Sequence, residues 1–114
     1  NPLAMAVGNA VLDILFEKNF LKDVKEKGEY FHKGLNKIKE KYPNIITEIR
    51  GIGLIKGIKT MVDNAEFMKK LLNHKMLTIK AEENVIRLFP PLIVSISELD
   101  EANNKIEAVC KEMS

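Results

Sequence analysis

Residues 1–18 carry apolar side chains around most of a helical circumference. Only Asn9, Asp13 and Glu17, spaced four apart, form a polar stripe. A helix that is apolar nearly all round is buried on several sides. We therefore expect residues 1–18 to form a linking helix that packs on another domain or subunit. The chain starts at Asn1 and enters this pattern at once, so we expect it to be a piece of a larger protein.

Residues 20–42 follow a different pattern, in which apolar side chains recur every three or four positions. This spacing predicts a helix with one stripe facing a core. Pro43 and Asn44 are expected to end it. The stripe consists of Leu21, Val24, Gly28, Phe31, Leu35, Ile38 and Tyr42.

The isoleucine-rich segment 45–59 predicts a hairpin of two strands, with Gly51-Ile52-Gly53 near its turn. A short helix should follow, begun by Asp63 with Glu66 three residues later, a spacing that resembles a capping box. Segments 76–80 and 84–88 are expected to form two further short strands, the second ended by two prolines.

The last helix is expected to be capped by Ser97 and to present Cys110 on its apolar face. A cysteine on such a face is typical of a small core residue rather than a nucleophile. The predicted order is α-α-β-β-α-β-β-α. The fold class is therefore α+β, with a small, mostly antiparallel sheet covered on one side by helices. Residues 19–114 form the small domain, and residues 1–18 link it to the rest.

Composition excludes several classes of function. The formal charge of +2 is too small to indicate nucleic acid binding. No apolar run is long enough to cross a membrane. The two histidines have no partners at metal-ligand spacing, so we expect no metal site. The single cysteine favours a reducing, cytoplasmic location. The lysines show no sign of a desolvated catalytic amine and are expected at the surface.

Arg87 is the one candidate binding residue. In a strand over residues 84–88, Val85, Arg87 and Phe89 point one way, and Ile86 and Leu88 point the other way. Arg87 could pair with a local carboxylate or extend to water. It could also clamp a ligand, because a guanidinium binds a carboxylate through paired N–H donors. For Arg50, which stands beside Gly51 at a turn, we favour a structural role.

Three stretches, "NPLAMAVGNAVLDIL" (1–15), "EIRGIGLIKGIK" (48–59) and "NVIRLFPPLIVSISELDEA" (84–102), occur in one order and spacing together with "VKEKGEYFHKGLNKI". This chain resembles the C-terminal small domain of class III aminotransferases, which are fold-type I enzymes that use pyridoxal phosphate. Within the class, the acetylornithine aminotransferases are the most similar group. The resemblance covers essentially the whole chain.

The resemblance implies that Arg87 binds the substrate carboxylate, since it matches the arginine of the family's Val-Ile-Arg strand. It also implies an amino-group transfer between N-acetylornithine and 2-oxoglutarate, in arginine or lysine biosynthesis. The parent would be a homodimer with a large domain that holds pyridoxal phosphate. No catalytic or cofactor-binding residue is expected in this chain. The Schiff-base lysine lies in the large domain, so the chain alone is expected to bind no cofactor and to be inactive.

Two alternatives remain at this point. The chain could belong to another class III ω-aminotransferase, acting on ornithine or 4-aminobutyrate, because substrate choice depends on residues outside it. It could also be a non-catalytic module that binds an amino acid. The apolar first helix argues against a module that stands alone.

Overall fold

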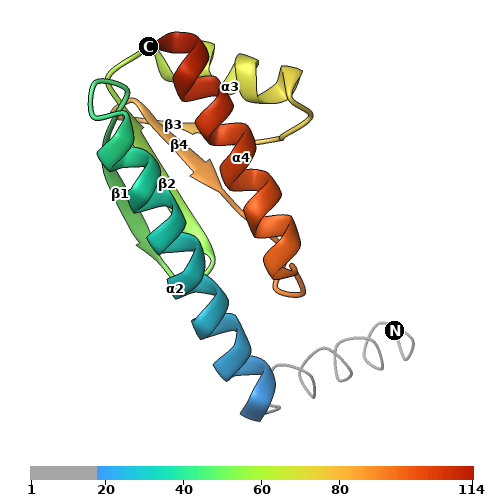
Figure 1. The fold of residues 1–114 in the computed structure, drawn as a ribbon. Helices are drawn as coiled ribbons and strands as arrows, with labels where there is room; N and C mark the ends of the chain where they lie inside the picture. Colours follow the sequence, from blue (N-terminus) through green and yellow to red (C-terminus); the bar gives the residue numbers. More distant parts are fainter. Residues whose placement is uncertain (1–17) are drawn as a thin grey trace, which may run out of the picture.

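The computed structural model describes residues 18–114, which form one helical layer and one sheet (Figure 1). The helix expected over residues 1–18 lies outside this part, apart from Lys18, with which α2 begins. The elements are α2 (Lys18–Lys41), β1 (Ile46–Ile52), β2 (Ile55–Thr60), α3 (Asn64–Asn73), β3 (Ile79–Ala81), β4 (Val85–Leu88) and α4 (Ile96–Met113).

The four strands form one antiparallel sheet in the order β1-β2-β4-β3. The hairpin expected over residues 45–59 is therefore confirmed as β1 and β2. Gly53 has a φ of 62° at its turn, a conformation that glycine adopts without steric cost. The predicted α+β class, with a mostly antiparallel sheet, is confirmed.

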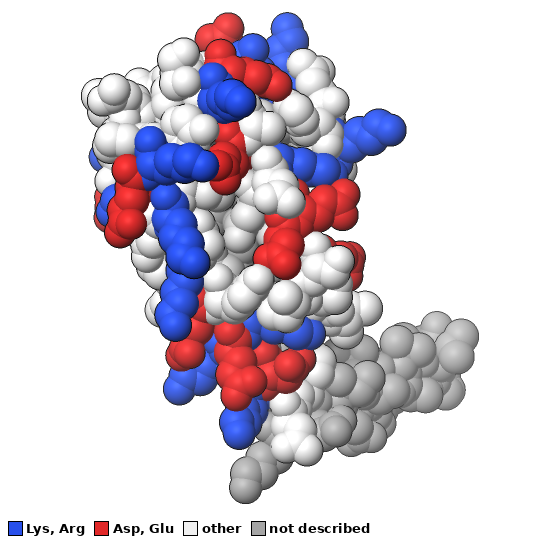
Figure 2. All heavy atoms as spheres, viewed as in Figure 1, with Lys and Arg blue, Asp and Glu red and all other residues white. Residues whose placement is uncertain are grey.

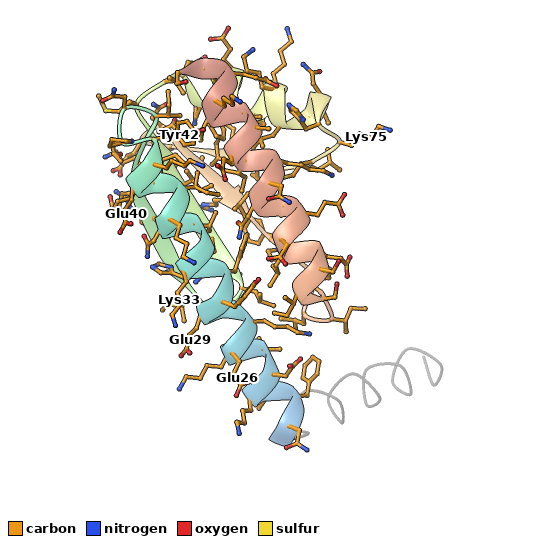
Figure 3. All side chains as sticks on the ribbon, in the orientation of Figure 1. Glu26, Glu29, Lys33, Glu40, Tyr42 and Lys75 are labelled. Atoms are coloured by element: carbon orange, nitrogen blue, oxygen red, sulfur yellow. The ribbon has the colours of Figure 1, made fainter. Side chains whose placement is uncertain are left out.

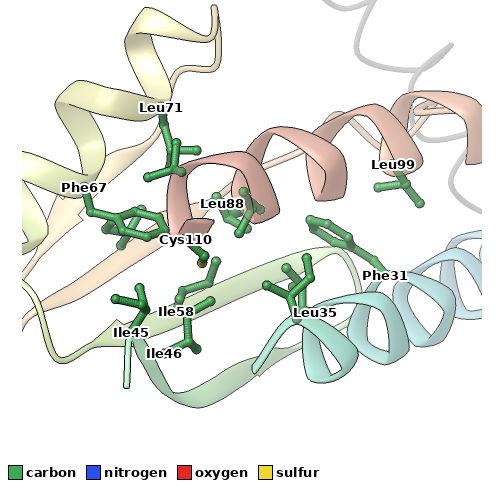
Figure 4. Close-up of a cluster of buried hydrophobic side chains, with 14 of the residues drawn as sticks. Phe31, Leu35, Ile45, Ile46, Ile58, Phe67, Leu71, Leu88, Leu99 and Cys110 are labelled. Atoms are coloured by element: carbon green, nitrogen blue, oxygen red, sulfur yellow. The ribbon is translucent and has the colours of Figure 1, made fainter. Parts of the chain in front are cut away.

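The hydrophobic core lies between the sheet and the helices, which cover one face of it (Figures 1 and 4). Phe31 and Leu35 of α2 lie in this core with Ile58 of β2, as the stripe on residues 20–42 predicted. Cys110 of α4 is fully buried, which confirms its assignment as a core residue. Burial raises the pKa of its thiol to about 12, so the reactive thiolate form is suppressed.

The outer surface of α2 is a mixed charged face. Figure 2 shows Lys and Arg atoms interleaved with Asp and Glu atoms over this helix. Glu29, Lys33 and Glu40 are exposed there and project from the helix in Figure 3. This arrangement is typical of a solvated helix surface.

Both predicted helix starts need correction. Ser95, not Ser97, caps α4: its hydroxyl accepts from the Glu98 amide at 3.1 Å, and the Glu98 carboxylate accepts from the Ser95 amide at 3.1 Å. Asp63 does occupy the cap position of α3, but its side chain makes no capping hydrogen bond. The Asn64 amide bonds to the side chain of Asn84 instead, at 2.8 Å, so the expected capping box is absent.

The strand expected over residues 76–80 is shorter than predicted, because β3 begins only at Ile79. Lys75 has a φ of 63°, and the Met76 amide donates to the Leu71 carbonyl at 2.9 Å. These are features of a helix C-terminus. Met76 is therefore tied to the end of α3 and cannot join the sheet. No helix within residues 18–114 is long and apolar enough to span a bilayer.

Candidate carboxylate-binding site

Alternation along β4 divides its side chains between the two faces of the sheet. Ile86 and Leu88 are buried beneath the helices, whereas Arg87 is exposed on the other face. This confirms the predicted orientation of Arg87 relative to its neighbours. The helices leave that other face uncovered in the described part of the chain, and we call it the open face.

The register of the sheet places one residue from each strand in a single row across the open face. Arg50 of β1 pairs with Gly57 of β2, Gly57 pairs with Arg87 of β4, and Arg87 pairs with Ile79 of β3. The two arginines of the chain therefore flank a glycine. Neighbouring strands lie about 4.8 Å apart, so the backbones of the two arginines are separated by roughly 10 Å.

A hollow of about 910 Å³ lies over this row. Arg50, Gly57 and Arg87 line it, together with Val85 and the acidic turn between β3 and β4. Its volume is in the range of small-molecule sites. Two guanidinium groups in one hollow are suited to an anionic ligand.

The two arginines differ in their partners. Arg50 forms ion pairs with Glu48 at 2.9 Å and with Glu83 at 3.5 Å. The hydrogen bond from Arg50 holds the pKa of the Glu48 carboxyl below its usual value. Within residues 18–114, no carboxylate lies within ion-pair distance of Arg87. Arg50 thus has the local partners of a structural residue, and Arg87 is the arginine with capacity for a ligand.

Buried Asn64 and partly buried Asn84 fix the start of β4, two residues before Arg87. The Asn64 amide nitrogen Nδ2 donates to the carbonyls of Ala81 at 3.0 Å and Val85 at 3.1 Å. Asn84 Nδ2 donates to the Thr60 carbonyl at 2.6 Å. These bonds join β2, α3 and both strands of the second hairpin. Sequence reasoning missed them because the partners are far apart along the chain.

Glu83 reaches Arg50 because of the turn between β3 and β4. Glu83 and Asn84 have φ values of 60° and 61°. Ala81 pairs with Val85, so three residues connect the two strands, and two of them in succession are left-handed, as hairpin turns often require. Asparagine tolerates this conformation well, whereas a glutamate there is less common. The turn places the Glu83 carboxylate at the rim of the hollow.

Lys56 corrects the expectation that every lysine lies at the surface. It pairs with Leu88 across the sheet and is only 3% exposed. It shares the alternation of Ile58, which places it on the helix-covered face below α2. Burial lowers the pKa of its amine. Burial also lowers the pKa of His32 on α2, and the charge of Lys56 adds to that effect. Its side chain belongs to the face opposite Arg87.

The described residues do not fit pyridoxal phosphate by themselves. A phosphate group favours a helix start with free amides and no nearby negative charge. The starts of α3 and α4 instead carry Asp63 and Glu98, whose carboxylates would repel it. The open face offers guanidinium groups for a carboxylate.

Comparison with known proteins identifies the family. The model of the family described as "Aminotransferase class-III" matches residues 1–110. The chain belongs to the class-III aminotransferases. It is 44% identical to the acetylornithine aminotransferase of Mesorhizobium japonicum and 42% identical to that of Agrobacterium fabrum, over 100% of its own length. It spans 29% of the length of each of these relatives.

Solved structures of aminotransferases share the fold. The acetylornithine aminotransferase of Elizabethkingia anophelis superposes with a TM-score of 0.88 at 29% identity, covering 98% of this chain and 30% of that one. An ornithine aminotransferase of Plasmodium yoelii superposes with a TM-score of 0.81 at 24% identity, over 90% of this chain and 28% of that one. The fold expected from the resemblance, that of the small domain of fold-type I enzymes, is confirmed.

Proposed function

We propose that this chain is the C-terminal domain of an acetylornithine aminotransferase, in which Arg87 binds the carboxylate of the substrate. The parent enzyme would transfer an amino group from N-acetylornithine to 2-oxoglutarate, giving glutamate. It would be a cytoplasmic homodimer of arginine or lysine biosynthesis. The identity of 42–44% to curated acetylornithine aminotransferases supports this assignment.

One observation carries the role of Arg87. It lines a hollow of about 910 Å³ on the open face, and no carboxylate of residues 18–114 neutralises it. A guanidinium binds a carboxylate through two parallel N–H···O bonds. Both proposed substrates carry such a group, so one clamp serves both halves of the reaction.

Arg87 would contribute to catalysis by positioning. A substrate held at its carboxylate has fewer orientations, and correct orientation lowers the barrier by several kcal/mol. Pyridoxal phosphate, when bound by the rest of the enzyme, supplies the electron sink for amino transfer. The described residues provide the carboxylate clamp and its setting. We propose that the chain alone neither binds the cofactor productively nor transaminates.

The test is substitution of Arg87 in the full-length enzyme. Arg87→Ala should lower kcat/KM for 2-oxoglutarate by at least about tenfold, equivalent to about 1.4 kcal/mol. Lys59→Ala is the matched control. Lys59 lies in β2 on the open face, as Arg87 does in β4, but it does not line the hollow. It should leave kcat/KM unchanged. Equal, small effects of both substitutions would refute the clamp.

The choice among amino donors is tested separately. N-acetylornithine, ornithine and 4-aminobutyrate should be compared as donors with the same enzyme at fixed 2-oxoglutarate. Our proposal expects the highest kcat/KM for N-acetylornithine. A preference for ornithine or 4-aminobutyrate would assign the parent enzyme to another substrate within the class. The role of Arg87 would still be decided by the Arg87→Ala substitution.

A further inference from the structure

Gly57 is a glycine whose backbone does not require one. It lies inside β2, and its φ is outside the left-handed region that only Gly51 and Gly53 enter among the described glycines. Glycine inside a strand weakens it and often marks a place where a ligand or another backbone approaches closely. The conformation of Gly57 therefore leaves its identity unexplained.

Packing does not demand a glycine at this position either. A Cβ added at Gly57 would lie 3.3 Å from the Val85 Cγ1 atom and 3.8 Å from the Arg50 Cβ atom. Both neighbours are side-chain atoms, and no backbone atom stands within 4 Å apart from the chain neighbours. The fold would admit an alanine if Val85 moved by a few tenths of an ångström. By contrast, a Cβ at Gly28 would meet the backbone of Gly53 at 2.6 Å.

Gly57 forms the floor of the hollow, between the two arginines that also line it. Side chains on a strand stand roughly perpendicular to the sheet. A side chain at residue 57 would therefore rise between Arg50 and Arg87, into the hollow that both line. The charge of Arg50 is already neutralised by its ion pairs with Glu48 and Glu83. A ligand carboxylate should therefore bind Arg87, while Arg50 only bounds the hollow on the opposite side.

We infer that Gly57 is a specificity-determining residue, whose missing side chain makes room for the substrate carboxylate against the sheet beside Arg87. This inference rests on the proposed function. It assigns the glycine to ligand access rather than to backbone conformation or packing. The space between the two arginines is then large enough for a flat carboxylate group but too small for a bulkier ligand group.

The experiment measures binding of glutarate, an unreactive dicarboxylate, to the full-length enzyme by isothermal titration calorimetry. Gly57→Ala should raise the Kd roughly tenfold and Gly57→Val by roughly 100-fold, since each added carbon intrudes on the bound group. The same variants should raise KM for 2-oxoglutarate more than they lower kcat. Thermal melting of each variant reports its stability.

Val85→Ala separates ligand access from packing, because Val85 is the one close neighbour of the added Cβ. The double variant Gly57→Ala/Val85→Ala removes the contact but keeps the methyl group between the arginines. Our inference expects glutarate binding to stay roughly tenfold weaker than in Val85→Ala alone. The double variant also allows the test if Gly57→Ala by itself does not fold.

The inference is overturned if the double variant binds glutarate as well as Val85→Ala does, or if Gly57→Ala lowers only the melting temperature. Its failure is distinguishable from failure of the proposed function. If Arg87→Ala weakens glutarate binding and Gly57→Ala does not, Arg87 remains the clamp and only the role of Gly57 is lost. If Arg87→Ala has no effect, the clamp itself is refuted.

Discussion

Ile86 and Arg87 are neighbours in β4, yet Ile86 is completely buried beneath the helices, and Arg87 is exposed on the open face. The same contrast extends across the sheet. The covered face carries the buried Ile46, Ile58 and Leu88, whereas the open face carries Arg50 and Arg87. The two faces are built from the same strands and differ only by a shift of one residue.

This difference separates stability from binding. The covered face is continuous with the core and supplies the hydrophobic free energy of folding. The open face holds ionic groups together with exposed apolar residues such as Ile55 and Ile79. Substitutions on the covered face should change the free energy of unfolding, and those on the open face should change binding.

The largest expected effect comes from two adjacent residues. Ile86→Ala should lower the free energy of unfolding by about 2–5 kcal/mol, because it leaves a cavity in the core. Arg87→Ala should lower it by less than about 0.5 kcal/mol, since it removes an exposed side chain. Urea unfolding of the chain, followed by circular dichroism, measures both. Similar losses for the two variants would show that the open face also carries stability.

Lys56 offers the next test, because it is a charged residue on the covered face. Lys56→Met should raise the free energy of unfolding by about 1–2 kcal/mol at neutral pH, since burying an amine without a strong partner is unfavourable. Lys59→Met is the matched control on the open face of the same strand, and it should give no comparable gain. Urea midpoints of both variants decide the point.

The increase in the free energy of unfolding caused by Lys56→Met should be larger at neutral pH than at high pH. The pKa of the buried amine is lowered from 10.5, so below the folded-state pKa the amine is charged in both states and the desolvation cost is complete. The cost disappears as pH rises past the unfolded-state pKa, where the amine is neutral in both states. The advantage of Lys56→Met should therefore shrink as pH rises through the lowered folded-state pKa and be lost above the ordinary value of 10.5. An advantage that stayed constant would point to packing rather than charge.

Periodicity predicted most of the fold because each element has a clear pattern. The core stripe of α2, the isoleucine-rich hairpin and the opposite orientations of Ile86 and Arg87 all follow from spacings of three to four or two residues. The burial of Lys56 was also available, because strand alternation places it on the same face as Ile58. We missed it by assigning all lysines to the surface from composition.

The remainder of the site depends on contacts that no local pattern encodes. The row that joins Arg50, Gly57 and Arg87 requires the register of three strands. The hydrogen bond from the Asn64 amide to the Asn84 side chain links residues 20 positions apart. Long-range register is set by the whole fold, so sequence could predict the face on which Arg87 lies but not its neighbours.

The smallest expected effect concerns the start of α4, which lies over the covered face. Ser95 carries Glu98 three residues later, the spacing of a capping box, whereas Ser97 is followed at that spacing by Asp100. Ser95→Ala should lower the free energy of unfolding by about 1 kcal/mol, because the Glu98 amide loses the Ser95 hydroxyl that accepts its hydrogen bond. Ser97→Ala, two residues along and exposed, should change it by no more than about 0.5 kcal/mol. Because α4 packs on the covered face, neither substitution should alter the Kd for glutarate in the full-length enzyme. Weaker glutarate binding by Ser95→Ala would mean that a change on the covered face alters the binding site around Arg87. Stability and binding would then not be separated between the two faces of the sheet.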